Sequence, residues 1–106
     1  MLSKQNCVTV KSGEAAISEK DVKAMLGQVN GWALAHGGKA IFRKFTFKDF
    51  DSALALANKI AAIAQKENHH PDIGFGWGYV KVKLTTHDVG GLHKNDFIMA
   101  AKINEL

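Results

Sequence analysis

The chain has 106 residues, a formal net charge of +4 and 46% hydrophobic residues, which predicts one domain around a single core. Its only cysteine, Cys7, excludes an internal disulfide framework, and no segment is apolar for long enough to be a signal sequence or a membrane span. A cytoplasmic protein without a membrane partner is expected, and the scattered lysines, which have no interleaved aromatics, argue against direct nucleic-acid binding.

The chain begins with a polar stretch and a short helix. Within a domain of residues 1–106, residues 1–16 show no periodic pattern and could form a flexible N-terminal extension. Ser18 is typical of a helix cap, and the apolar stripe that follows it predicts a helix ending near Gly27. The body of the fold is therefore expected to start at Ser18.

A hairpin is predicted next. Residues 32–36 and 40–47 alternate between apolar and polar side chains and flank the turn sequence HGGK. Ile41 and Phe45 fall on one face of the second strand. Arg43 falls on the same face, so the alternation is imperfect.

A second, longer helix is predicted from a cap at Thr46 to about Asn68. The positions expected to face a sheet recur with the helical period: Phe50, Ala53, Leu54, Ala57, Ala61 and Ala64. A second apolar stripe, on another side, contains Leu56, Ile60 and Ile63. A helix that is apolar on two sides needs a second partner, which predicts self-association through this helix. The alternative is that the first helix covers the stripe.

The remaining segments complete the predicted fold. Residues 72–76 and 79–86 are expected to be strands joined by the turn sequence GWG, with Val80, Val82 and Leu84 inward. Residues 92–103 are expected to form a third helix. The order is α-β-β-α-β-β-α, which predicts an α+β fold: a four-stranded antiparallel sheet with three helices on one face.

Two adjacent histidines mark the end of the second helix. Pro71 disfavours helical backbone for His70, so the helix must stop at or before His69 and His70. The partial negative charge of the helix end favours a protonated imidazole, which can donate a proton near neutral pH. His87 stands at the end of the last strand. If that strand end lies beside the helix end, imidazoles from two segments converge on one cleft.

Each of these residues also has a purely structural interpretation. His69 and His70 could simply cap helix carbonyls, and Asp96 could balance the positive end of the third helix. Trp77 is expected to be a turn or packing aromatic rather than a surface that stacks on a substrate. His36 and His93 are expected to be solvated.

Metal and nucleophile chemistry find less support in the sequence. His69, His70, His87 and Asp96 are suitable ligand types, but adjacent histidines in extended backbone point to opposite sides, and neither H-E-x-x-H nor Cys-x-x-Cys is present. No metal site is therefore predicted, although a small metal-binding protein remains an alternative. No serine lies in a nucleophile elbow, and Gly74, Gly76 and Gly78 form no dinucleotide fingerprint.

The spacing of these residues resembles a known signature. His69-His70-Pro71, Trp77, His87 and Asp96 match the pattern of the pterin-4a-carbinolamine dehydratases, also known as dimerisation cofactors of a homeodomain transcription factor. The similarity runs from about Ile17 to the C-terminus. It includes the sequences NGW, FTFKDF, TTHDVGGL and NDFIMAAKI.

The resemblance implies both a fold and a reaction. Family members have a four-stranded antiparallel sheet with three helices and assemble as dimers or tetramers, which implies a homodimer or homotetramer here. Their reaction removes water from 4a-hydroxytetrahydropterin and yields quinonoid dihydropterin, which is recycled for aromatic amino acid hydroxylases. The reaction needs a general acid and a general base but no metal or redox cofactor, so no cofactor is predicted.

The resemblance also assigns roles to residues of this chain. His69, His70 and His87 become the catalytic histidines, with His69 and His87 as acid/base candidates and His70 as a substrate-positioning residue; which of the pair is the acid stays open. The expected lining of the pterin site also includes Asn68, Thr85, Thr86 and Asp88. Supporting roles fall to Gln65, Trp77 and Asp96.

One position departs from the family pattern. Four residues before the first histidine the family usually has a charged residue, commonly glutamate, and here that residue is Gln65. One helical turn from His69, an amide can hydrogen-bond but cannot hold the ring protonated, which predicts a slower enzyme. The alternative function is a binding protein that uses the same scaffold to stabilise an oligomer. That role would explain both the altered position and the two-sided helix.

Overall fold

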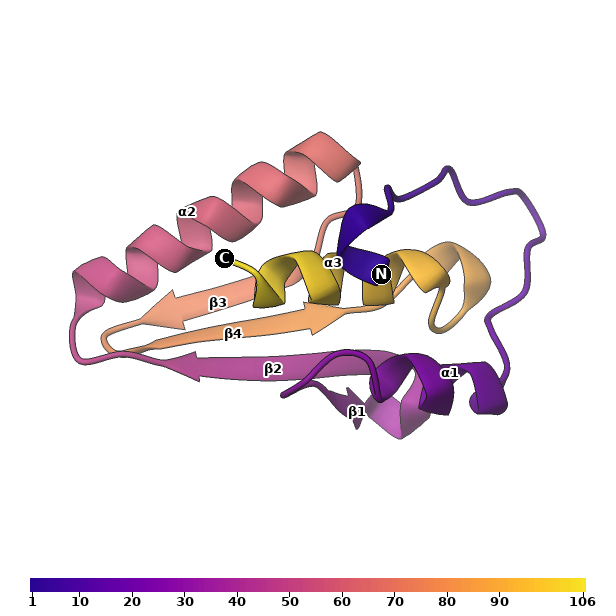
Figure 1. Ribbon diagram of the computed structural model, residues 1–106, viewed down its shortest axis with the longest axis horizontal. Coiled ribbons are helices and arrows are strands. Elements are labelled where there is room, and N and C mark those ends of the chain that lie inside the picture. The colour runs from indigo at the N-terminus through magenta and orange to yellow at the C-terminus, as the bar shows by residue number, and fades with distance from the viewer.

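The computed structural model describes residues 1–106 and shows the predicted α+β fold. Three helices lie on one face of the sheet (Figure 1): α1 (Glu19–Leu26), α2 (Phe50–Glu67) and α3 (Lys94–Asn104). The four strands are β1 (Ala33–Ala35), β2 (Ala40–Thr46), β3 (Asp72–Gly76) and β4 (Tyr79–Leu84). Three short 3-10 turns are η1 (Leu2–Lys4), η2 (His36–Gly38) and η3 (His87–Val89). None of the helices combines the length and the hydropathy that a bilayer crossing needs.

The sheet is antiparallel throughout, in the order β1-β2-β4-β3. β4 lies inside the sheet, and its inward residues Val80, Val82 and Leu84 are fully buried, as their alternation predicts. Ile41 of β2 is opposite Leu84. This register fixes the end of β4, and the Thr85 that follows it, beside the start of β2.

Arg43 points toward the helices, but it has polar partners there. Its guanidinium donates to the side-chain Oδ1 of Asn104 in α3 and to the backbone carbonyl of Asn30, at 3.0 Å in the latter case. Trp32 Nε1 donates to the same Asn104 oxygen at 2.9 Å. The polar side chain of Arg43 on the inward face of β2 is therefore paired, because the Asn104 amide at the end of α3 accepts from both Arg43 and Trp32.

The predicted start of α2 was wrong. The N-cap is Asp49, not Thr46, and Asp49 Oδ1 accepts from the backbone N–H of Ser52 at 2.7 Å. Thr46 still pairs with Tyr79 in the sheet, and the next residue, Phe47, donates its N–H to Gly78. The chain stays extended until it passes that turn, so Asp49 is the residue available to cap.

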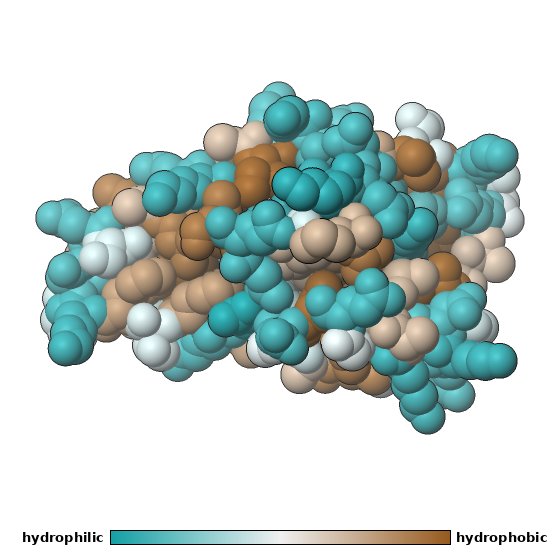
Figure 2. All heavy atoms as spheres, viewed as in Figure 1, coloured by the Kyte–Doolittle hydropathy of each residue, from teal (hydrophilic) through white to brown (hydrophobic).

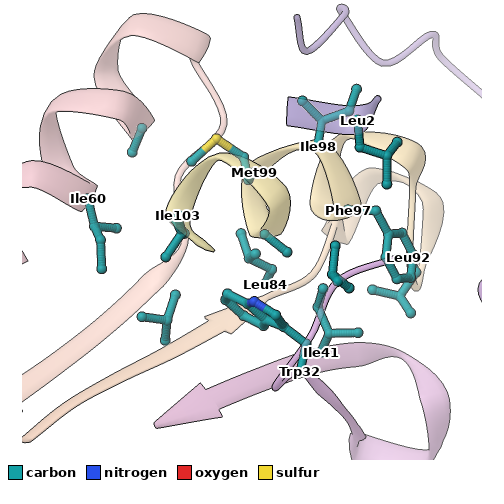
Figure 3. Packing of buried hydrophobic residues seen from close by; sticks show 14 of the residues in the cluster. Leu2, Trp32, Ile41, Ile60, Leu84, Leu92, Phe97, Ile98, Met99 and Ile103 are labelled. Atoms are coloured by element: carbon teal, nitrogen blue, oxygen red, sulfur yellow. The ribbon is translucent and has the colours of Figure 1, made fainter. Parts of the chain in front are cut away.

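The predicted orientation of α2 was partly wrong. Ala53, Ala57 and Ala64 are buried as expected, but Ala61 is exposed and Phe50 is 44% exposed. Ile60, assigned to the second stripe, is fully buried, and Leu56 and Ile63 pack partly against the core. The helix contacts α3 as well as β3 and β4, so its buried face is turned toward α3 (Figure 3). Apolar side chains still lie among polar ones along the α2 side of the surface (Figure 2).

The N-terminal residues pack against the fold. Leu2 is buried on the outer side of α3, next to Ile98 (Figure 3). Lys102 Nζ donates to the carbonyl of Ser3 at 3.0 Å. The segment then runs past the end of α2 before it reaches α1 (Figure 1). It therefore lies close to the helix end that carries the paired histidines.

Candidate active site

The end of α2 separates the two adjacent histidines. Asn68 caps the helix in the left-handed conformation, with φ 52° and ψ 40°, which Asn tolerates better than most residues. The N–H of His69 then donates back to the carbonyl of Ala64 at 3.2 Å, the bond of a Schellman-type ending. This reversal turns His69 inward toward α3, whereas His70 is exposed.

A buried carboxylate holds His69. Its Nε2 lies 2.7 Å from Oδ1 of Asp96, which has no exposed surface, while the His69 side chain is 12% exposed. The second carboxylate oxygen accepts from the Thr86 hydroxyl at 2.8 Å and from the His93 N–H at 3.0 Å. Three hydrogen bonds compensate the burial of this charge and fix the orientation of the imidazole.

His93 has a structural role, and the expectation that it is solvated was wrong. It is 5% exposed and caps α3: Nδ1 accepts from the N–H of Asn95 at 3.0 Å. Asp96 completes the capping box by accepting the His93 N–H. Nε2 of His93 lies 2.9 Å from Oε2 of Glu14. The Glu14 carboxylate accepts hydrogen bonds from the Lys11 N–H and from His93, and these bonds hold its pKa below the usual range. His36, by contrast, is exposed as expected.

The loop after β4 presents His87. Thr86 pairs with Gly91 across the loop, and its N–H donates to the Gly91 carbonyl at 2.8 Å. Between them η3 forms a single turn that ends at Gly90, where φ is 69°. The Thr85 hydroxyl donates to the Lys39 carbonyl at 2.6 Å, which ties the loop to the β1–β2 connection. An exposed His87 is thus carried on a backbone that is anchored on both sides.

These segments surround one cavity of about 540 Å³, within the range of roughly 300–1,000 Å³ typical of ligand sites. The sequence-predicted residues that line it are Asn68, His69, His70, Thr85, Thr86, His87 and Asp88. A smaller cavity of about 260 Å³ adjoins it at Thr85 and His87. Imidazoles from two separate chain segments therefore face one shared space.

Three candidates with supporting roles do not line the cavity. Asp96 lies behind His69. Gln65 contacts His70 rather than His69, with Oε1 3.2 Å from Nε2 of His70, because the reversal at Asn68 carries His69 away from the helical path. Trp77 is 70% exposed in the β3–β4 turn, at the opposite end of β4 (Figure 1).

The sequence reasoning missed a whole side of the cavity. The additional lining residues are Cys7, Val8, Thr9, Val10, Glu67 and Asn95. Burial, reinforced by the negative charge of Glu67, raises the pKa of the Cys7 thiol to about 12, so it stays protonated and is a poor nucleophile near neutral pH. Glu67 stands two residues before His69, and Asn95 belongs to the quoted sequence NDFIMAAKI. The N-terminal residues carried no comparable signal.

The side chains do not form a cluster suited to a metal ion. No group of three His, Cys, Asp or Glu side chains has the arrangement that would hold one. The chemistry available in the cavity is proton transfer by imidazoles and hydrogen bonding by hydroxyl, amide and backbone groups.

Known proteins share both sequence and fold with this chain. The family model for pterin 4 alpha carbinolamine dehydratase matches residues 15–106. A protein of Halorhodospira halophila that carries this enzyme name provisionally is 41% identical over 105 residues, covering 99% of this chain and 96% of that protein. One from Xanthomonas campestris with the same provisional name is 45% identical, covering 99% of this chain and 89% of that protein.

Two solved structures have the same fold. One, described as a transcriptional coactivator/pterin dehydratase from Brucella melitensis, has a TM-score of 0.80 and 34% identity and covers 85% of this chain and 96% of that chain. The other is a pterin dehydratase-like protein identified as a RuBisCO assembly factor in the alpha-carboxysome. It has a TM-score of 0.61 and 23% identity over 72% of this chain and 88% of that chain, so it shows a shared fold alone.

Proposed function

The chain belongs to the pterin-4-alpha-carbinolamine dehydratase family, and we propose that it is a 4a-hydroxytetrahydrobiopterin dehydratase. The observation that carries the proposal is the shared cavity lined by His69, His70 and His87. Its product would be quinonoid dihydropterin, which supplies pterin recycling for an aromatic amino acid hydroxylase. The single thiol of Cys7 fits a reducing, cytoplasmic setting.

The reaction is an elimination that moves two protons. A general base takes the proton from N5 of the pterin, and the electron pair of that N–H bond forms the N5=C4a double bond. The C4a–O bond breaks, and the departing hydroxyl takes a proton from a general acid and leaves as water. No net oxidation occurs, so the proposal includes no metal and no redox cofactor.

His69 and His87 form the acid/base pair in this proposal. Asp96, 2.7 Å from His69, stabilises the positively charged imidazole, which is the form a general acid starts from and a general base ends in. His87 faces the same cavity from the loop after β4 and is open to solvent, with which it can exchange protons. His70 binds and positions the pterin. Asn68, Thr85, Thr86 and Asp88 contribute hydrogen-bonding groups around the ring.

Stopped-flow absorbance of chemically generated 4a-hydroxytetrahydrobiopterin tests the proposal. We expect the wild-type protein to accelerate dehydration, and we expect His69→Ala and His87→Ala each to lower kcat by about 10²–10⁴-fold, the usual contribution of a general acid or base. Lys20→Ala, which removes an exposed side chain of α1 outside both cavities, is the control and should retain wild-type activity. Failure of the wild type to accelerate dehydration would refute the proposal.

A binding role is the second candidate, because the Brucella melitensis protein is described as a transcriptional coactivator as well as a pterin dehydratase. A scaffold that stabilises a partner's oligomer does not require the histidines. In that case neither the wild type nor His69→Ala would raise the dehydration rate above that of the uncatalysed reaction. The same stopped-flow series therefore separates the two functions.

We also propose that the chain forms a homodimer or homotetramer through α2. With Ile60 in the core, the support that remains is the partial exposure of Leu56 and Ile63 on this helix. Light scattering should report a multiple of the 11.5 kDa chain mass. Ala62→Glu, a charge on the exposed side of α2, should lower that mass, whereas Ala15→Glu outside the helix should not. A monomeric wild type would refute this assembly.

A further inference from the structure

The N-terminal segment, residues 1–17, is anchored beside α3 at both of its ends. Leu2 is buried next to Ile98 at the start, and the N–H of Ile17 donates to the carbonyl of Leu92 at 3.0 Å at the finish. Between these anchors the chain passes the end of α2 (Figure 1). This path carries the segment across the end of the molecule that holds the histidines.

Two buried side chains hold the middle of the segment. Asn95, which is 2% exposed, accepts the Val8 N–H on Oδ1 at 3.0 Å and donates from Nδ2 to the Val8 carbonyl at 2.7 Å. Glu67 Oε1 accepts the N–H of Cys7 at 2.8 Å. Asn95 adjoins Asp96, and Glu67 stands two residues before His69. The segment is therefore fastened to the same helix ends that position the proposed catalytic histidine.

This segment supplies the apolar side of the cavity. Three of the 13 lining residues are hydrophobic, and all three, Cys7, Val8 and Val10, come from it. The helix end, the loop after β4 and Asn95 contribute only polar residues. Ligand sites usually combine apolar walls, which remove the ligand from water, with a few polar groups that orient it. Here the two functions are divided between different parts of the chain.

We propose that residues 7–10 form a wall of the substrate site, in which Val8 and Val10 contact the pterin ring or its side chain and set affinity and substrate preference. The inference rests on the proposed function for the identity of the ligand. Val8 is 63% exposed, so a ligand in the cavity can cover it. The match to the family model begins at residue 15, so the wall lies outside the part of the chain which that model describes.

The wall predicts a specific kinetic signature. Val8 and Val10 carry no group that can transfer a proton, so their loss should affect binding more than catalysis. The double variant Val8→Ala/Val10→Ala should raise KM for 4a-hydroxytetrahydrobiopterin by about tenfold, the usual effect of lost methyl groups in a pocket. Its kcat should change less than threefold. Asn95→Ala, which releases Val8 from α3, should raise KM in the same way. Leu34→Ala in β1, another exposed apolar residue, is the matched control and should change neither constant.

Calorimetric binding of 7,8-dihydrobiopterin, a stable pterin, makes the test independent of activity. The Val8→Ala/Val10→Ala protein should bind it about tenfold more weakly than wild type while its thermal midpoint stays close to wild type. Unchanged KM and Kd in this variant would refute the proposal that residues 7–10 contact the pterin, even if the protein is an active dehydratase. A wild type that binds the pterin through this wall but does not accelerate dehydration would overturn the catalytic proposal alone.

Discussion

At one end of β4 polar side chains are buried, whereas at its other end large apolar side chains are exposed. The four buried polar residues of the chain, Thr86, His93, Asn95 and Asp96, all lie within eleven positions of one another, after the strand ends. Phe50, Phe75 and Trp77 are 44%, 40% and 70% exposed near the strand's beginning. Both ends depart from the usual distribution of residues, in opposite directions.

The two departures differ in how they are compensated. Each of these four buried polar side chains has hydrogen-bond partners, and Asp96 alone accepts three bonds. At the other end the aromatic rings compensate one another only in part, with Phe50 and Phe75 at a centroid distance of 5.8 Å. A buried polar network is costly unless every member is paired, and this one lies beside the cavity that we propose as the active site.

The strongest test of this contrast is Asp96→Asn at the polar end. An asparagine can keep one acceptor toward Thr86 and His93, but its NH₂ group then faces His69 and cannot stabilise a protonated ring. We expect kcat for 4a-hydroxytetrahydrobiopterin to fall about 100-fold, as for the loss of other orienting partners. Asp72→Asn, at an exposed ion pair with Lys83, is the control and should keep kcat. Equal activity of the two variants would contradict the role given to Asp96.

The apolar end should respond in stability instead. Phe75→Ala removes a half-exposed ring and its contact with Phe50, which we expect to lower the free energy of unfolding by about 1–2 kcal/mol. Urea denaturation measures that loss, and kcat measured on the same protein should stay within twofold of wild type. A large fall in kcat would show that the two ends are coupled and would break the comparison.

A smaller effect is expected at the rim of the polar end. Gln65→Glu places a carboxylate where an amide now lies 3.2 Å from Nε2 of His70. Because exposed ion pairs contribute at most about 1 kcal/mol, kcat/KM should rise no more than about fivefold. Gln28→Glu, on the exposed surface beyond α1, provides the charge-matched control. A rise in kcat that leaves KM unchanged would place His70 in proton transfer rather than in substrate positioning.

The smallest effect concerns acid stability at the polar end. The pKa of Glu14 is lowered mainly by the bond its carboxylate accepts from the Lys11 N–H, and further by His93. A lowered folded-state pKa gives stabilisation that is present above the ordinary value of 4.5 and is lost as the pH falls through the folded pKa. The thermal midpoint of wild type should therefore fall more between pH 5 and pH 3 than that of Glu14→Gln, by thermal unfolding at each pH. Parallel curves, or the same difference for Glu105→Gln, would contradict this.

The sequence predicted best where burial leaves a strong periodic pattern. Val80, Val82 and Leu84 alternate strictly because only one face of β4 is covered, and all three are buried. Alanines in α2 carry a weaker signal, since small side chains are tolerated on both sides of a helix. Ala61 was therefore placed inward although it is exposed, and Ile60 was assigned to the wrong side.

The site was only partly predictable for a different reason. The paired histidines could be identified from the sequence because Pro71 predicts that the helix ends next to them. The N-terminal wall has no such mark: two hydrogen bonds with Asn95 and one with Glu67 position it, and such long-range contacts leave no periodicity in the chain. The burial of His93 was missed in the same way, because its partner Glu14 lies in that segment.

Because the chain reverses at Asn68, the length of α2 determines where His69 lies relative to Asp96. One residue inserted in the middle of the helix would rotate everything beyond it by about 100° and advance it by about 1.5 Å. His69 would then be displaced from Asp96. Residues halfway along the helix touch no reacting group, yet their number determines whether His69 meets the carboxylate, so deletions and insertions there should be far less tolerated than substitutions.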